Sequence, residues 1–349
     1  MNVQRTFWCS LSLLFGLTLL VVPVEGNTEQ RNPFKRFLKG SPQHNIPLKE
    51  IKHGGPPVDG IPALVNPDFV SVSEVDKLNP KDRLMVVEIV GVVRGYPRKI
   101  LDHHELVNDR INKTSFLVSW CPLCGSGMVF NRTLVGHRFE FGVSGLLYNS
   151  DVLMFDRKTD SLWSQLKGEA VVGELTGTKL SRIPHTQYTW KRFKNEYPSG
   201  RVLSFKTGYN RNYSAEAYQG YRKSDRLMFP VSNEDSRLSR KTPVIGVSFG
   251  KIDVAVPRNI LNSKKMITYG NKNHRLLFIH WKNASRVYEI PQTPDFTFSD
   301  NTLRVEEEQW KITNDYLESP DGTRYKRVSH VGSYWFAWAT FHPGTALIR

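Results

Sequence analysis

The sequence is poor in cysteine, and this limits what can hold the fold together. Its 349 residues include three cysteines, of which Cys9 lies in the N-terminal segment. Cys121 and Cys124 are the other two, so the rest of the chain can form at most one internal disulfide. Secreted domains of this size often carry several disulfides. We therefore expect a hydrophobic core rich in aromatic residues, rather than disulfides, to stabilise the protein.

The sequence also lacks a hydrophobic run that could cross a membrane. The run SLSLLFGLTLLVVPV, which follows Arg5, is shorter than the ~20 apolar residues of a spanning helix. With the small residues before Asn27, it has the pattern of a cleaved secretory signal over residues 1–26. The sequence therefore predicts a secreted protein with no transmembrane segment after cleavage. An uncleaved anchor is the alternative.

Acidic residues are scarce relative to basic ones. The chain has 33 Asp and Glu against 48 Lys and Arg, which gives a net charge of +15. Such a charge attracts anionic extracellular surfaces and glycans, the partners expected if the charge has a function. The basic residues are spread along the chain, so a solvated surface is the simpler interpretation. No nucleic-acid-binding motif is present, and nucleic acid is not an expected partner.

Four Asn-x-Ser/Thr triplets without proline occur in polar stretches typical of turns and strand ends. Each triplet alone is a weak signal for glycosylation, because such triplets also arise by chance. In a eukaryotic secretory host, we expect at least two of the four to carry glycans. The asparagines are Asn112, Asn131, Asn212 and Asn283.

The distribution of residues divides the chain after the signal into two parts. Residues 27–75 are rich in Pro and Gly and predict an extended leader with little structure of its own. Residues 76–349 contain short runs of alternating apolar residues separated by turn residues, which predict one β-rich domain. The best helix signal is TWKRFKNEYPSG, which ends at Pro198 and Gly200. The predicted class is mainly β with short helices (α+β) and antiparallel sheets.

Two short segments resemble each other and predict an internal repeat. PRKIL at 97–101 and PRNIL at 257–261 differ at one position, and each lies between two apolar strands. We predict two strand–helix–turn–strand units, at about 86–132 and 246–292. In the second unit, Trp281 and Ala284 stand at the positions of Cys121 and Cys124. The thiols are therefore not required by the architecture of the unit.

Several long motifs carry a resemblance to a known family. They are SWCPLCGSGMVF, FGVSGLLYNSDVLMFDR, SLWSQLKGEAVVGELTGTKL, SYWFAWATFHPGT and a segment with His104, Glu105, Val107, Asn108 and Asp109. With these motifs the chain resembles the domain-of-unknown-function family 3179, whose members are secreted or envelope proteins. The resemblance runs from about Val86 to the C-terminus, and the leader lies outside it. It implies a fold and the position of a site, and it implies no activity.

The Cys-x-x-Cys motif allows three interpretations: a local disulfide, half of a metal site, or inert buried thiols. A thioredoxin-type site is disfavoured, because Gly125-Ser126-Gly127 leads into a strand rather than a helix that would lower a thiol pKa. A disulfide in so small a ring adds little stability and would be labile. The form Cys-Pro-x-Cys-Gly also suits a zinc-binding turn between two strands.

A metal site needs further ligands, because the chain has no second Cys-x-x-Cys. His104 and Glu105 are the first choice, His342 is the second and His185 is the third. Two thiolates with imidazole would suit zinc or copper(I). Each histidine also has a structural interpretation: His104 on an exposed helix face, His185 as a hydrogen-bonding loop residue, and His342 as a cap of the core.

The segment after the motif is rich in polar residues that could line a pocket. Strand alternation places Asp151 and Asp156 on opposite faces, which argues against a catalytic carboxylate pair. Asp156 suits a turn, whereas Trp163 and Gln165 share a face. No hydrolase, metalloprotease or nucleotide-binding motif is present, so no catalytic residue is predicted. The pocket candidates are Asp109, Asp151, Asp156, Trp163, Gln165 and Glu169.

Overall fold

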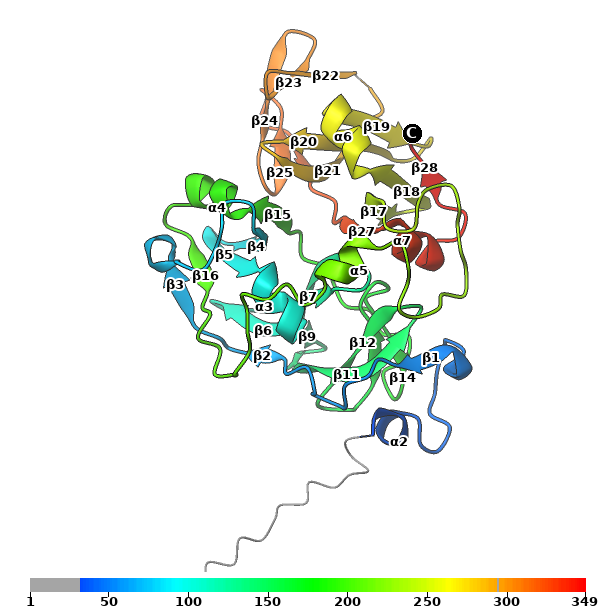
Figure 1. Ribbon diagram of the computed structural model, residues 1–349. Coiled ribbons are helices and arrows are strands. Elements are labelled where there is room, and N and C mark those ends of the chain that lie inside the picture. Colours follow the sequence, from blue (N-terminus) through cyan, green and yellow to red (C-terminus); the bar gives the residue numbers. More distant parts are fainter. Residues whose placement is uncertain (1–31, 294) are drawn as a thin grey trace, which may run out of the picture.

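The computed structural model describes residues 32–293 and 295–349, so the predicted signal peptide lies outside the described residues. Strands make up 42% of the structure and helices 14%, which confirms the mainly β class with short helices. Most strands pair antiparallel within several sheets (Figure 1). No helix in the described ranges is long and apolar enough to span a membrane.

An eight-stranded sheet joins the first half of the chain to the second. In spatial order its strands are β2 (Leu64–Val65), β6 (Leu106–Ile111), β7 (Thr114–Cys121), β8 (Ser126–Asn131), β27 (Val331–Tyr334), β17 (Pro243–Phe249), β18 (Ile252–Pro257) and β28 (Ala346–Leu347). The two sets of strands meet where Gly127 of β8 lies opposite Gly332 of β27. Strands from distant parts of the sequence therefore form one continuous sheet.

Each half of this sheet has a smaller sheet beside it. β-Branched runs such as VVEIV favour these strands, and in the first hairpin Val90 and Gly91 form the turn with positive φ. One sheet has the order β15 (Thr186–Thr189), β4 (Arg83–Ile89), β5 (Val92–Pro97), β16 (Arg201–Leu203) and β3 (Phe69–Ser71). The other contains β19 (Met266–Gly270), β20 (Arg275–Trp281) and β21 (Ala284–Ile290).

The remaining strands form a hairpin-rich sheet, a C-terminal sheet and a small hairpin. Asn149 and Ser150 form the two-residue turn of one hairpin, with φ of 53° and 63°. The first sheet contains β1 (Ile51–His53), β11 (Phe141–Tyr148), β12 (Asp151–Asp156), β13 (Leu162–Ser164) and β14 (Glu169–Val172). The others contain β22 (Phe296–Ser299), β23 (Thr302–Val305), β24 (Glu308–Ile312), β25 (Tyr316–Glu318), β26 (Arg324–Lys326), and β9 (Thr133–Leu134) with β10 (His137–Arg138).

The helices are short, and residues that favour helix starts precede three of them. Pro97 and Pro257 each precede a helix, and the Thr189 hydroxyl accepts a hydrogen bond from Arg192 N at the start of a third. That third helix lies in the segment TWKRFKNE, as predicted. The α-helices are α2 (Pro33–Phe37), α3 (Arg98–His104), α4 (Trp190–Glu196), α5 (Gln219–Lys223), α6 (Arg258–Lys264) and α7 (Trp335–Phe341), and the 3₁₀ turns are Leu48–Glu50 and Val72–Glu74.

The leader is more ordered than its composition predicts. β1 pairs with β11, β2 with β6 and β3 with β16, so the segment adds an edge strand to each of three sheets. These strands are only two or three residues long, too short to produce a recognisable pattern of alternating residues. Their backbone groups are satisfied by sheets whose other strands come much later in the chain.

Two stretches of the chain follow the same order of elements, β4-β5-α3-β6-β7-β8 and β17-β18-α6-β19-β20-β21. In the first hairpin Leu84 pairs with Pro97, and in the second Val244 pairs with Pro257. The two registers therefore differ by 160 residues (257 − 97). These stretches contain the two predicted repeat units.

The residue after each helix also makes the same backbone contacts. The carbonyl oxygen of Glu105 accepts a hydrogen bond from Trp120 N at 2.7 Å, and that of Lys265 accepts one from His280 N at 2.7 Å. Both residues have a positive φ, 57° for Glu105 and 64° for Lys265. Because a positive φ is uncommon for a residue other than glycine, the two stretches agree in local backbone conformation as well as in the order of elements.

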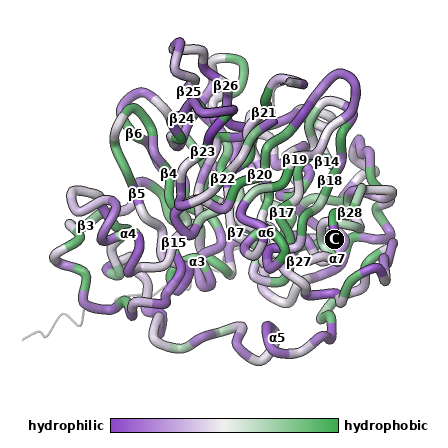
Figure 2. Tube along the Cα trace, turned by 90° about the horizontal axis from the view of Figure 1, so that it is seen from above, coloured by the Kyte–Doolittle hydropathy of each residue, from purple (hydrophilic) through white to green (hydrophobic). Residues whose placement is uncertain are grey.

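The hydrophobic core lies along the strands. Figure 2 shows hydrophobic (green) residues concentrated on strands in the interior and hydrophilic residues along many of the connecting loops. The largest buried cluster contains Cys121 and Cys124 together with Trp163, Trp335 and Trp338. The cysteines therefore lie in the aromatic core that was expected to stabilise the fold.

Candidate functional site

The Cys-x-x-Cys motif forms the connection between β7 and β8. Cys121 is the last residue of β7 and pairs with Ser126, the first of β8. Residues 122–125 make the connection, whereas the corresponding connection from β20 to β21 consists of Lys282 and Asn283 alone. The thiols thus lie on a turn between strands, as predicted, and this turn is longer than its counterpart.

Neighbouring elements hold this turn in place. Gly125 has φ of 60°, and a Cβ at this position would lie 2.8 Å from the ring of Tyr334. The amide of Tyr334 donates a hydrogen bond to Cys124 O at 2.8 Å, and the Tyr221 hydroxyl donates one to Leu123 O at 3.0 Å. Glycine is therefore needed at 125 for both its backbone angle and the close approach of β27.

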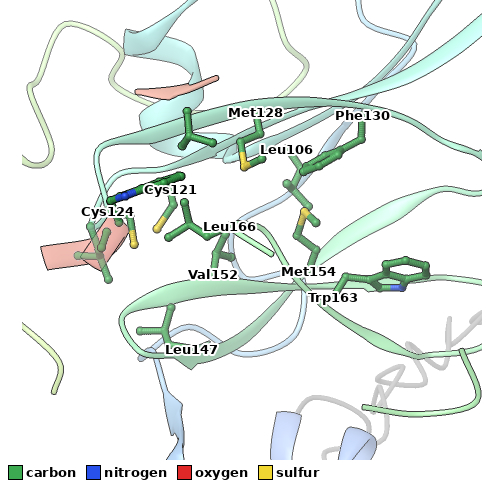
Figure 3. Packing of buried hydrophobic residues seen from close by; sticks show 14 of the residues in the cluster. Leu106, Cys121, Cys124, Met128, Phe130, Leu147, Val152, Met154, Trp163 and Leu166 are labelled. Atoms are coloured by element: carbon green, nitrogen blue, oxygen red, sulfur yellow. The ribbon is translucent and has the colours of Figure 1, made fainter. Parts of the chain in front are cut away.

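Both thiols point toward a second turn, between β11 and β12. Ser150 O lies 3.7 Å from Cys121 Sγ and 3.3 Å from Cys124 Sγ. Figure 3 shows the two sulfur atoms side by side, with Val152 near them. The two cysteines are 3.5 Å apart and are free thiols, far from the ~2.05 Å of a disulfide bond. The predicted disulfide is therefore not present in this structure.

Asp151 brings a third donor to the thiols. One of its oxygens and the two sulfur atoms all lie within 4.8 Å of one another. Its Oδ2 accepts hydrogen bonds from Ser164 Oγ at 2.8 Å and from Leu166 N at 3.0 Å. Its Oδ1 is buried without a partner. Burial raises the pKa of Asp151 to about 7, since a charged carboxylate is poorly solvated there.

Glu105 adds a second buried carboxyl group to this region. Burial raises its pKa to about 8, and the charges of Asp102 and Asp151 contribute in the same direction. Burial also raises the pKa of the Cys124 thiol, with smaller contributions from Cys121 and the acids. Within the described residues, neither Glu105 nor Asp151 forms an ion pair. The site is a buried acidic cluster without a basic partner.

Gln165 also reaches this site, and Glu169 does not. The Ser126 hydroxyl donates a hydrogen bond to Gln165 Oε1 at 2.7 Å, and Gln165 Nε2 donates one to Ser126 O at 3.2 Å. Gln165 therefore fixes the end of the cysteine turn. Glu169 accepts a hydrogen bond from Asn45 at 2.5 Å at the surface.

The structure separates His104 from the thiols. Both ring nitrogens are engaged, Nδ1 with Pro62 O at 2.7 Å and Nε2 with the Tyr213 hydroxyl at 2.6 Å. The ring is fully buried, so it is not on an exposed helix face either. Its neighbour Glu105 begins a new backbone direction with positive φ, which explains how adjacent residues reach different regions.

The other two predicted histidine ligands also lie elsewhere. His342 stacks on Trp338, with 3.7 Å between ring centroids, and its Nδ1 lies 3.2 Å from an oxygen of Asp253. His185 stacks on His330, with 6.2 Å between centroids, and lines a cavity that contains neither thiol. Neither side chain belongs to the group of donors formed by the thiols and Asp151.

Three pocket candidates have structural partners instead. Asp109 forms an ion pair with Arg94 at 2.5 Å and accepts a hydrogen bond from the Tyr96 hydroxyl at 2.6 Å. Asp156 accepts one from Trp163 Nε1 at 2.9 Å. The carboxyl groups of Asp151 and Asp156 therefore lie in different environments, in agreement with the alternation of side chains along the strand.

A family model described as "Protein of unknown function (DUF3179)" matches residues 58–345. The chain belongs to this family. The match begins earlier than Val86, so the family includes part of the leader, in agreement with its pairing in the sheets. No curated protein and no solved structure matches the chain.

In this family member, sequence reasoning found the thiols and missed the contact of Asp151 with them. Asp151 was considered only as a residue lining a pocket. The local signal present in the sequence is Asn149-Ser150, a two-residue hairpin turn that places Asp151 at the tip of a hairpin. What no local pattern shows is that this tip meets the cysteine turn.

Proposed function

We propose that this chain is a secreted glycoprotein that binds one transition-metal ion through Cys121, Cys124 and Asp151. The observation that carries the proposal is the meeting of three potential ligand atoms within 4.8 Å, one of them an oxygen of a buried carboxylate. Thiolates with a carboxylate suit zinc, and a pair of thiolates alone suits copper(I). The metal would join two turns from different sheets.

The surroundings favour a cation over inert thiols. A fully buried carboxylate oxygen without a hydrogen bond, such as Asp151 Oδ1, is costly unless something binds it. A metal ion would neutralise the thiolates and the carboxylate together, and its charge would reverse the upward shifts of their pKa values. A redox role is less well supported, because a buried thiol with a raised pKa, such as Cys124, is a poor nucleophile.

Glu105 is the proposed fourth ligand for zinc, which prefers four in a structural site. Its carboxyl group is buried, has no hydrogen-bond partner among the described residues, and interacts electrostatically with both Asp151 and Cys124. Copper(I), which accepts fewer ligands, would leave Glu105 free.

Metal analysis of the protein purified from a secretory host tests this proposal. We expect about one zinc or copper ion per chain, lost in Cys121→Ser and in Asp151→Asn. His104→Gln is the matched control, because His104 was the first ligand predicted and lies with Tyr213 instead. A wild-type protein without bound metal, or equal metal content in Cys121→Ser, would contradict the proposal.

We further propose that the two stretches with the same order of elements are duplicates. Their support is the shared register offset of 160 residues (257 − 97), the matching positive φ of Glu105 and Lys265, and the related PRKIL and PRNIL segments. Superposition of 86–132 on 246–292 in an experimental structure tests this. The cysteine turn would then be a feature that only one duplicate carries.

Secretion and glycosylation are part of the same proposal. Asn112, Asn212 and Asn283 are exposed, which supports their use as glycan sites. Asn131 is half-buried, and its Oδ1 accepts a hydrogen bond from Thr133 N at 2.8 Å, so we expect it to be the least modified. Peptide mass spectrometry of the secreted protein, with and without glycan removal, measures both the cleavage site and the occupancy. Attraction to anionic surfaces is the additional role proposed for the net charge.

A further inference from the structure

A cavity lies away from the thiols, between β15 and β4 on one side and α6, β20 and β27 on the other. Its volume is about 250 Å³, and none of its thirteen lining residues is acidic. Five of these residues are basic and come from separate parts of the chain. They are Arg83, His185, Arg258, His280 and His330.

The two arginines of this cavity have no partner of opposite charge. Within the described residues, Arg83 and Arg258 form no ion pair and no side-chain hydrogen bond, and Arg258 Nε is a buried donor without an acceptor. Burial, with a contribution from Arg83, lowers the pKa of Arg258 to about 10. A guanidinium group so placed usually binds a carboxylate, and among the described residues none is available, so a bound anion would suit it.

Glycine at position 332 makes room for one of these groups. A Cβ at this position would lie 2.9 Å from Arg258 Nη2, with Gln187 Nε2 the next nearest atom at 3.6 Å. The backbone of Gly332 does not require glycine, because its φ is not positive. The absence of a side chain at position 332 therefore leaves room for the guanidinium group of Arg258.

The histidines of the cavity offer neutral donors rather than a metal site. Burial, with further contributions from nearby basic groups, lowers the pKa of His185 and of His280 to about 4, and it lowers the pKa of His330 as well. His280 Nδ1 is buried without a partner. Among the described residues, these imidazoles do not bring three nitrogen atoms within 4.8 Å of one another, in contrast with the thiols and Asp151.

Two more guanidinium groups lie behind the wall of the cavity. Arg327 donates a hydrogen bond to His185 O, and Arg286 donates one to the Tyr188 hydroxyl at 2.6 Å. Within the described part of the chain, neither forms an ion pair with a carboxylate. Their charges add to the positive potential inside the cavity, where low-dielectric walls strengthen it.

We propose that this cavity binds a tetrahedral oxyanion, the phosphate or sulfate group of a small molecule, with Arg83 and Arg258 as its ionic partners. Guanidinium groups donate paired hydrogen bonds to such oxygens, and donors from β4, α6 and β20 approach from different directions. A planar carboxylate, which has two oxygen atoms, could accept hydrogen bonds from fewer of these donors. The rest of the wall carries Gln187, Asn262 and Ser285, which suit a hydroxyl-bearing organic part.

Calorimetric titration of the full chain tests the proposal. The probes are inorganic phosphate, inorganic sulfate, glucose 6-phosphate and a sulfated monosaccharide, with acetate as the planar comparison. We expect Arg258→Gln to weaken the best of the phosphate or sulfate probes about tenfold or more, and Arg83→Gln to do the same. Arg240→Gln is the charge-matched control, because Arg240 pairs with Glu234 at the surface, and we expect less than about a twofold change.

A second variant guards against a folding defect. Gly332→Ala keeps every charge and displaces only the end of the Arg258 side chain, so it should fold and still weaken binding. If wild-type protein freed of its glycans binds none of the four phosphate and sulfate probes at millimolar concentration, or if Arg258→Gln and Gly332→Ala bind like wild type, the proposal is wrong. Acetate that binds as tightly as phosphate would overturn the assignment of a tetrahedral ligand.

The glycan state of the protein has to be controlled in this experiment. Asn283 lines the cavity and belongs to a predicted glycosylation triplet. We therefore titrate the protein before and after enzymatic removal of glycans. Binding that appears only after removal would place the ligand at the same cavity and show that a glycan at Asn283 covers it.

Discussion

The regions around α3 and around α6, which we call the first and the second corner, share the order of elements and the hairpin register and differ in the charge of their side chains. Arg98 and Arg258 each follow a proline at the start of the helix, and one turn later Asp102 stands where the other helix has Asn262. After the helices, Glu105 corresponds to Lys265. The first corner gathers carboxyl groups and thiols, and the second gathers guanidinium and imidazole groups.

This difference indicates that a similar arrangement of strands and helix can form either site, and that the side chains determine whether the ligand is a cation or an anion. In the first corner Asp102 binds Arg222 at 2.6 Å and also accepts a hydrogen bond from Trp120 Nε1 at 2.8 Å. In the second corner Asn262 stands at the position of Asp102, and among the described residues Arg258 forms no ion pair. A cation is expected where acids are in excess and an anion where bases are in excess.

The largest effect is expected from giving the first corner the turn of the second. Replacing residues 122–125 by Lys-Asn, the sequence of the β20–β21 turn, should keep the sheet and remove the metal site. We expect the bound metal to fall from about one ion per chain to none, and the unfolding free energy to fall by on the order of 5 kcal/mol.

Elemental analysis and thermal unfolding with and without a chelator measure this effect. Wild-type protein should lose stability when the chelator is added, and the turn variant should not respond to it. If the variant keeps its metal, the longer turn is not the origin of the difference between the corners. Far-ultraviolet circular dichroism controls for loss of the fold.

The next largest effect should come from Asp102→Asn, which makes the first corner resemble the second. The change removes the buried ion pair with Arg222 and leaves the charge of that guanidinium group without its carboxylate partner. We therefore expect a loss of about 3 kcal/mol in the unfolding free energy. Asp253→Asn is the control, because Asp253 is partly exposed in its contact with His342 and should cost less than about 1 kcal/mol. Urea denaturation of both variants measures the difference, and equal costs would contradict it.

The sequence predicted the first corner far better than the second, for physical reasons. The cysteine turn is a local pattern: two thiols, a proline and a glycine between two apolar strands. Short strands, turns and the Thr189 helix start were local as well, so the β-rich class and α4 could be predicted. Contacts between distant turns, such as that of Asp151 with the thiols, leave no periodic signal.

The basic cavity left no local signal, because its side chains come from five separated segments. Arg83, His185 and His330 each lie at the start of a strand or just before one, where a basic residue is unremarkable. The predicted repeat aligns Arg258 with Arg98 and Asn262 with Asp102. The sequence shows an asparagine instead of an acidic residue at position 262, but it does not show which side chains lie around that position.

A smaller effect is expected from acid. The pKa of His185 is lowered to about 4 by burial and by Arg327, whereas an unfolded histidine has a pKa near 6.5. The unfolded chain therefore binds the proton first as the pH falls, so stability present above about pH 6.5 is lost between there and about pH 4. By about pH 5 we expect this single group to account for about 2 kcal/mol of the loss.

Comparison of wild type with His185→Gln between pH 7 and pH 4 measures this effect. The groups that face the same space are His280, His330, Arg258 and Arg83, so wild-type stability should still fall in the variant, but less steeply. Saturating phosphate should reduce the loss in wild type, because a bound anion favours the protonated histidines. A slope that is identical in wild type and His185→Gln would show that His185 is not protonated on unfolding in this range.

The smallest effect concerns one charge in the second corner. Asn262→Asp copies Asp102 and places a carboxylate one helical turn from Arg258, where it can pair with the guanidinium group. We expect phosphate or sulfate to bind about tenfold more weakly, equivalent to about 1.4 kcal/mol, because the carboxylate competes for Arg258 and repels the anion. Asn259→Asp adds the same charge to an exposed position of the same helix and serves as the control. Equal affinities for the two variants would show that Arg258 is not the group that distinguishes the corners.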